Sequence, residues 1–91
     1  MSLTRHARIR MQQRGIRADV VENLLNYGCA AHDHRGAEIL FFDKAARRRI
    51  ARERGDDALR RLGKRLRTYL VMDSGGEVLT VGHRTRRIRR S

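Results

Sequence analysis

The fold is decided by the stretch Leu66-Arg-Thr-Tyr-Leu-Val-Met-Asp-Ser-Gly-Gly-Glu-Val-Leu-Thr-Val-Gly-His-Arg84. Apolar and polar residues alternate on both sides of its Ser-Gly-Gly segment, and a period of two is typical of half-buried strands. A glycine-rich turn joins such strands into a hairpin. We therefore predict antiparallel strands over about 66–73 and 77–84. The residues expected on one face of the second strand are Leu79, Val81 and His83.

Two helices are expected at the N-terminus. The first begins after Thr4, a favourable N-cap residue, and ends at Gly15, a residue type common at helix C-caps. The second spans about residues 18–27 and ends at Gly28. The apolar residues are Ala7, Ile9 and Met11 in the first helix and Val20, Val21, Leu24 and Leu25 in the second. Because few residues separate them, the two helices are expected to form a hairpin.

Two more strands and a basic helical segment lie between the helix pair and the closing hairpin. The strands are predicted over 29–34 and 37–42, on either side of a turn at Arg35-Gly36. Asp43 is then placed to cap a helix over 44–54.

A second piece of the basic segment starts at Asp56 or Asp57 and runs to about Lys64. The order of helices and strands is typical of an α+β domain, with helices packed on one face of an antiparallel sheet. We predict two N-terminal helices packed on a small antiparallel β-sheet, with an inserted basic helical segment. Residues 1–91 are expected to form a single domain, in which 84–91 is a basic C-terminal tail.

The charge of the chain is strongly positive and unevenly distributed. Its formal net charge is +12, of which residues 1–42 contribute +2 and residues 43–91 contribute +10. Twenty of the 22 basic residues are arginine, whose planar guanidinium binds phosphate through two parallel hydrogen bonds. This composition favours a polyanion such as RNA or another nucleic acid as the partner. An anionic membrane, an acidic partner protein or a GC-rich coding bias is the alternative.

The cysteine content and hydropathy point to one compartment. The chain has one cysteine, Cys29, which excludes an intramolecular disulfide and is typical of a reducing cytosol. No apolar run approaches the ~20 residues of a membrane-spanning helix, and the N-terminus lacks the apolar core of a signal peptide. We expect a cytoplasmic protein with no membrane partner.

His6, Arg10 and Arg14 fall at positions i, i+4 and i+8 of the first predicted helix, so they line one side of it. A histidine followed by two arginines can hold a phosphate and transfer a proton. The alternatives are a solvated polar face opposite Ala7 and Met11, or a buried His6 that ties the helix to the sheet.

A second candidate group lies in the closing hairpin. Tyr69 and His83 would share a face of the sheet if the register placed them opposite each other. In RNA transesterification the ribose 2′-OH attacks the adjacent phosphorus, a base takes its proton, and cations stabilise the phosphorane without a metal. On these grounds the candidate catalytic residues are His6, Arg10, Tyr69 and His83. The alternative is that Tyr69 is an ordinary sheet aromatic and that the C-terminal tail is a disordered anion-binding arm.

Other arginines are candidates for holding the nucleic-acid backbone. The helix over 44–54 keeps a narrow apolar stripe, Ala46 and Ile50, and otherwise presents charge, which is typical of an element that contacts phosphates. A solvated helix that meets an acidic protein is the alternative. The residues expected to bind nucleic acid are Arg14, Arg48, Arg52, Arg84, Arg86, Arg87, Arg89 and Arg90.

Cys29, His32 and His34 are close enough in sequence to be considered as metal ligands. Three such residues without a second cysteine fall short of a four-ligand structural zinc site. We expect no metal and no cofactor.

Two segments of the chain resemble a family of small bacterial proteins catalogued as domain of unknown function 4258. Thr4-Arg-His-Ala-Arg-Ile-Arg-Met-Gln-Gln-Arg-Gly-Ile16 resembles its opening His-Ala-x-x-Arg-Met-x-x-Arg-Gly-Ile motif. Leu70-Val-Met-Asp-Ser-Gly-Gly-Glu-Val-Leu-Thr-Val81 resembles its closing strand pair. The family is similar in expected fold to RelE/ParE-like toxins, in which two N-terminal helices lie against a curved antiparallel sheet.

Those toxins are metal-independent ribonucleases or gyrase inhibitors, usually neutralised by a small antitoxin. The resemblance implies that His6, Arg10 and Arg14 belong to the functional site, and that an acidic antitoxin protein or the ribosome is a partner. The chain departs from the family pattern in its inserted arginine-rich helical segment and its arginine-rich end.

We therefore expect a small basic RelE-like protein that binds RNA and cleaves it as a metal-independent toxin ribonuclease. The helix face with His6, Arg10 and Arg14 would form one wall of a cleft, and the strand ending in His83 the other. The alternatives are a non-catalytic nucleic-acid-binding module and a ParE-like toxin that binds a protein.

Overall fold

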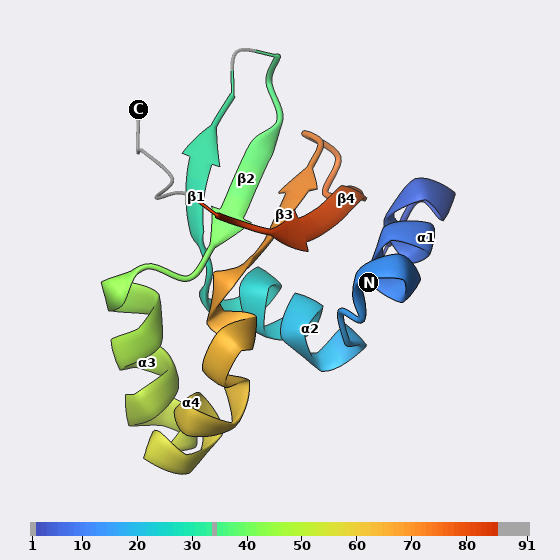
Figure 1. Cartoon of the computed structure of the whole chain (residues 1–91). Helices are drawn as coiled ribbons and strands as arrows, with labels where there is room; N and C mark the ends of the chain where they lie inside the picture. Colours follow the sequence, from blue (N-terminus) through green and yellow to red (C-terminus); the bar gives the residue numbers. More distant parts are fainter. Residues whose placement is uncertain (1, 34, 86–91) are drawn as a thin grey trace.

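The chain folds into a four-stranded sheet with helices packed against it (Figure 1). The computed structural model describes residues 2–33 and 35–85. In chain order the elements are α1 (Arg5–Arg14), α2 (Ala18–Tyr27), β1 (Cys29–His32), β2 (Glu38–Phe41), α3 (Lys44–Arg54), α4 (Asp56–Leu62), the 3-10 helix η1 (Gly63–Arg67), β3 (Thr68–Met72) and β4 (Val78–His83). The strands are antiparallel in the order β1-β2-β3-β4. These elements confirm the predicted α+β class.

The closing hairpin forms as predicted, with an irregularity that changes which side chains enter the core. The register shifts between Val71 and Met72, so that Met72 lies opposite Val78. As a result Val78 and Val81 are buried, whereas Leu79 is half-buried. The register skips Leu79, since Val71 pairs with Thr80 and Met72 with Val78, so the extra residue of the bulge lies in β4 and interrupts the alternation predicted for that strand.

The strands are shorter than the sequence pattern predicts. β1 ends at His32 and β2 begins at Glu38, so Asp33 and Ala37, both predicted to lie in strands, belong to the connection between them. The basic segment continues into η1, and β3 therefore begins at Thr68 instead of Leu66. Leu66 still packs against the core, because the 3-10 helix turns its side chain inward before the chain enters the sheet.

Helix α1 has the predicted caps but a narrower apolar face. The Thr4 hydroxyl accepts a hydrogen bond from the Ala7 N–H at 3.1 Å, and Gly15 adopts the left-handed conformation with φ 62°. Ala7 is buried and Met11 half-buried, but Ile9 is 43% exposed. Ile9 is thus not part of the face that packs on the sheet, which corrects the predicted stripe.

Helix α1 runs along β4, and this arrangement positions the functional site. The Thr4 N–H donates to the Val78 carbonyl at 3.0 Å, and its hydroxyl donates to the Leu79 carbonyl at 3.0 Å. The start of α1 is therefore fixed at the start of β4 (Figure 1). The last residue of the helix, Arg14, consequently lies near the last residue of the strand, His83.

The core lies between the helices and one face of the sheet. Its largest fully buried side chains include Phe42, Leu24, Ile50 and Leu70. Burying a side chain of this size contributes about 1.5–3 kcal/mol. Helix α3 contributes Ala46 and Ile50, the two residues predicted for its apolar stripe. No helix within residues 2–33 and 35–85 is long and apolar enough to cross a membrane.

Replacing Asp43 with alanine is expected to lower the free energy of unfolding by about 1 kcal/mol. The Asp43 carboxylate accepts a hydrogen bond from the Ala46 N–H at 2.8 Å and so caps α3. Chemical denaturation measures the change. Asp43→Ser keeps a capping oxygen and should lose much less stability, so equal losses in the two variants would show that capping is not the cause.

Candidate functional site

The end of β4 brings together residues from α1, β3 and β4. Nε2 of His83 lies 3.2 Å from the carbonyl oxygen of Arg14. A carbonyl oxygen only accepts hydrogen bonds, so we infer that Nε2 carries the proton of this contact. In the neutral imidazole Nδ1 is then the nitrogen that can accept a proton. His83 is exposed, which leaves the ring accessible to a ligand.

Gly82 marks the place where Arg14 and Tyr69 meet. Gly82 lies opposite Tyr69 in the β3–β4 pair. A Cβ atom built on Gly82 would lie 2.4 Å from Nη1 of Arg14 and 2.9 Å from the Tyr69 hydroxyl oxygen. The guanidinium and the hydroxyl therefore occupy the space that a side chain at position 82 would fill. This group of four residues, Arg14, Tyr69, Gly82 and His83, is called the β4-end cluster below.

Position 82 requires glycine because neighbouring side chains leave no room for a Cβ atom, and not because of its backbone conformation. Its φ is not among the positive values found in this chain, so other residues could adopt its backbone geometry. Sequence reasoning did not single out Gly82. A glycine inside a predicted strand indicates a close approach of another group, and that signal could have identified it.

The expectation that Tyr69 and His83 share a face of the sheet is wrong. The register pairs Tyr69 with Gly82 and His83 with Thr68, and directly opposed residues of an antiparallel pair project to the same side. Tyr69 and His83 therefore belong to opposite faces. Arg14 connects them, because its carbonyl oxygen contacts His83 and its guanidinium lies beside the Tyr69 hydroxyl.

The other candidate histidine lies apart from this cluster. Nε of Arg10 donates a hydrogen bond to Nε2 of His6 at 3.4 Å, and His6 is exposed. His6 precedes Arg14 by eight residues on the same helix, which is about 12 Å along its axis. The candidate residues of α1 thus form two groups, the His6–Arg10 pair and the Arg14 contact with β4.

Helix α3 divides its arginines between packing and solvent. The Arg49 guanidinium lies 5.4 Å from the centroid of the Tyr27 ring. Nη1 of Arg54 donates to Oδ1 of the buried Asn23 at 3.0 Å. These contacts hold α3 against α2. Arg48 and Arg52, the two residues expected to bind nucleic acid, are exposed.

Arg84, the first residue of the expected tail, is held on the sheet. Its N–H donates to the Arg67 carbonyl at 2.8 Å, and Nη2 donates to the Phe42 carbonyl at 3.1 Å. Its guanidinium carbon lies 5.5 Å from the centroid of the Phe41 ring. Arg84 is thus anchored beside the β4-end cluster. The remaining arginines of the expected tail, Arg86, Arg87, Arg89 and Arg90, lie outside the described residues.

Cys29 and His32, two of the three residues considered as metal ligands, are the first and last residues of β1. His34 lies outside the described residues, and Cys29 is a half-buried free thiol. Among residues 2–33 and 35–85 no group of three histidine, cysteine or acidic residues is arranged to hold a metal ion.

Comparison with known proteins places this fold in a family. No curated protein and no solved structure matches the chain. A family model described as Domain of unknown function (DUF4258) matches residues 3–81, which include α1, the whole sheet up to Val81 and the inserted helices. The matched region holds the His6–Arg10 pair, Arg14 and Tyr69, and it ends one residue before Gly82. Since this match covers most of the 91 residues, the chain belongs to the DUF4258 family.

Proposed function

We propose that this protein binds RNA and cleaves it without a metal, in the manner of the RelE-like toxins. The observation that supports the proposal is the β4-end cluster. In this cluster the Arg14 guanidinium lies beside the Tyr69 hydroxyl, and the His83 imidazole contacts the Arg14 carbonyl oxygen. A cation that holds phosphate and a histidine that transfers a proton are the two groups that RNA transesterification needs.

In the proposed reaction the Arg14 guanidinium, which lies beside the Tyr69 hydroxyl, binds the scissile phosphate. Nδ1 of His83 takes the proton of the 2′-OH, and the 2′-oxygen forms a bond to phosphorus. The bond from phosphorus to the 5′-oxygen breaks, and that oxygen takes a proton from water. The products are a 2′,3′-cyclic phosphate and a 5′-OH end. Arg14 stabilises the extra negative charge of the phosphorane.

The hydrogen bond between His83 and Arg14 has a positioning role in this scheme. Because the Arg14 carbonyl accepts from Nε2, it favours the ring tautomer in which Nδ1 is free to act as the base. His6 and Arg10 lie farther along α1, where they are placed to contact a neighbouring phosphate.

The purified protein is expected to cleave RNA equally well with and without EDTA, either as free RNA or as mRNA on ribosomes. A labelled RNA analysed for cyclic-phosphate and 5′-OH ends measures the reaction. The matched control is His32→Ala, which removes an exposed histidine from β1, at the opposite edge of the sheet. Absence of cleavage on both substrates would rule out the enzyme.

A non-catalytic nucleic-acid-binding module is the second candidate. It is favoured by the exposed cations of the helical segment, such as Arg48 and Arg52, which lie outside the β4-end cluster. RNA binding that weakens steeply with salt, with no cleavage by the wild-type protein, would support this function instead. A ParE-like role, in which the basic surface meets an acidic antitoxin or a topoisomerase, predicts binding to protein and none to RNA.

A further inference from the structure

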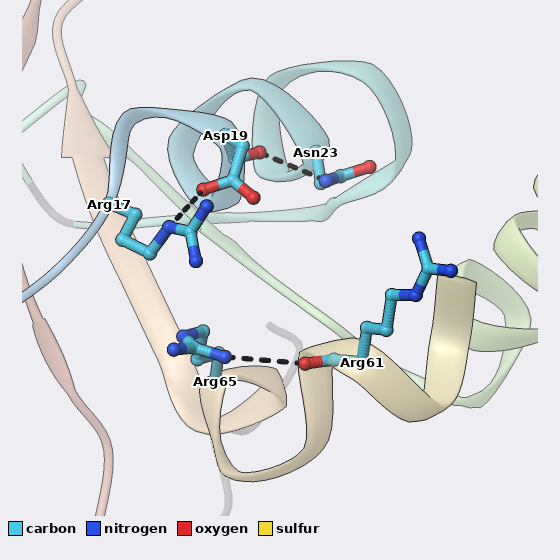
Figure 2. A network of polar contacts seen from close by, with 5 residues as sticks. All are labelled: Arg17, Asp19, Asn23, Arg61 and Arg65. Carbon is cyan, nitrogen blue, oxygen red and sulfur yellow. Dashed lines mark hydrogen bonds and ion pairs between the residues drawn. The ribbon is translucent and has the colours of Figure 1, made fainter. Parts of the chain in front are cut away.

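Arginines outside the β4-end cluster lie on both sides of the space between α2 and η1 (Figure 2). Arg17 is the residue before α2, Arg61 lies in α4 and Arg65 in η1, and all three are exposed. Figure 2 shows Arg17 and Arg65 on the two sides of this space, whereas the Arg61 guanidinium points away from both. We call Arg17 and Arg65 the α2–η1 cluster.

Two contacts hold the side chains of this cluster in place without cancelling its charge. Nε of Arg17 lies 3.3 Å from Oδ1 of Asp19, whose side chain is 55% exposed. Nη1 of Arg65 donates to the carbonyl oxygen of Arg61 at 3.3 Å (Figure 2). A carbonyl oxygen orients a guanidinium but leaves its positive charge in place. The two arginines and Asp19 together carry a net charge of +1, and the ion pair of Arg17 is formed by its Nε.

The α2–η1 cluster is continuous with the β4-end cluster along two segments of the chain. Arg17 follows Arg14 by three residues, and Arg65 precedes Tyr69 by four. Since Arg14 and Tyr69 meet over Gly82, the two segments converge there. A chain extends at most about 11 Å over three residues and about 14 Å over four, so the backbones of Arg17 and Arg65 lie within these distances of the backbones of Arg14 and Tyr69.

We propose that the α2–η1 cluster is a second phosphate-binding site, which holds the RNA strand next to the phosphate bound at the β4-end cluster. The inference rests on the proposed function, because it assumes that RNA occupies the β4-end cluster. The substrate class is a single-stranded RNA of several nucleotides. A strand without a base-paired partner can bend from the sheet end to η1 and present its phosphates to both clusters.

The double variant Arg17→Gln/Arg65→Gln tests this site. For a single-stranded RNA of about 12 nucleotides, we expect the Kd to rise about tenfold and the slope of log K against log salt to fall by about 1.4, or 0.7 per phosphate contact. The loss of affinity should be larger for this RNA than for a dinucleotide, which has one phosphate and reaches one cluster only. Circular dichroism and thermal melting confirm that the variant is folded.

The matched control is Arg5→Gln/Arg8→Gln, which removes the same charge from exposed positions near the start of α1. If both double variants weaken RNA binding equally, the overall charge explains the effect, and the proposal of a second phosphate-binding site is wrong. If the test variant loses more affinity for duplex RNA than for single-stranded RNA, the substrate class is wrong. If the wild-type protein binds no RNA, the proposed function itself has failed, an outcome that the wild-type titration shows separately.

Discussion

Replacing His83 with alanine is expected to lower the rate of RNA cleavage by about 10²- to 10⁴-fold, the usual contribution of a general base. The variant removes the ring nitrogen that takes the 2′-OH proton, and it leaves the Arg14 guanidinium in place to bind phosphate. His83 is exposed at the strand end, so the fold should be retained. Single-turnover cleavage of a labelled RNA gives the rate, and a parallel titration should give a Kd within about threefold of the wild-type value.

His83→Gln separates the chemical role of the side chain from its structural one. The glutamine amide can still donate a hydrogen bond to the Arg14 carbonyl, but it cannot act as a base. We expect it to bind RNA as the wild-type protein does and to cleave as slowly as His83→Ala. His32→Ala should keep the wild-type rate. Substantial cleavage by His83→Gln would show that His83 positions Arg14 and does not transfer a proton.

Replacing Gly82 with alanine is expected to weaken RNA binding by about 10- to 100-fold while the protein stays folded. The new methyl group would stand 2.4 Å from Nη1 of Arg14, so the guanidinium must leave its place beside the Tyr69 hydroxyl. A hydrogen bond to a charged group contributes about 1.5–3 kcal/mol, which sets the size of the loss. RNA titration and single-turnover cleavage measure the effect.

The stability of Gly82→Ala should change by less than about 1 kcal/mol. The nearest atom is the end of a flexible side chain, which can move at small cost. Replacing glycine by alanine also reduces the entropy of the unfolded chain, which offsets part of the clash with the Tyr69 ring. Chemical denaturation of the variant tests this expectation.

Two further variants show whether Gly82 acts through Arg14. Gly75→Ala places a methyl group in the hairpin turn, 3.4 Å from the Asp73 carboxylate, and should leave RNA binding unchanged. In an Arg14→Ala background, Gly82→Ala should cause no additional loss of affinity, because the displaced group is already absent. Additive losses would contradict the proposed link between the two residues.

The high arginine content serves two physical roles in the described structure. Arg49, Arg54 and Arg84 contact aromatic rings, carbonyl oxygens or a buried amide and connect elements of the fold. Arg48 and Arg52 are exposed and remain candidates for contacts with a polyanion. Composition predicts the total charge but cannot assign these roles, because they depend on which element packs behind each guanidinium.

The local parts of the fold were predictable from short-range patterns. Thr4 and Gly15 bound α1, and Asp43 caps α3, because capping depends on residues three or four positions away. The bounds of α2 follow in the same way from its apolar residues and Gly28. The exposure of Ile9 was missed, since the apolar pattern does not say how closely α1 approaches the sheet.

The sequence by itself determined the helices, the hairpins, the excess of arginine and the identity of the side chains capable of acid–base chemistry. The tertiary structure alone decided which of them meet. The register that places Tyr69 opposite Gly82, and the packing of α1 along β4 that brings Arg14 to His83, join residues up to 69 positions apart. Such contacts are fixed when the shared core is packed, since local periodicity carries no information about a bulge or about which helix lies over which strand.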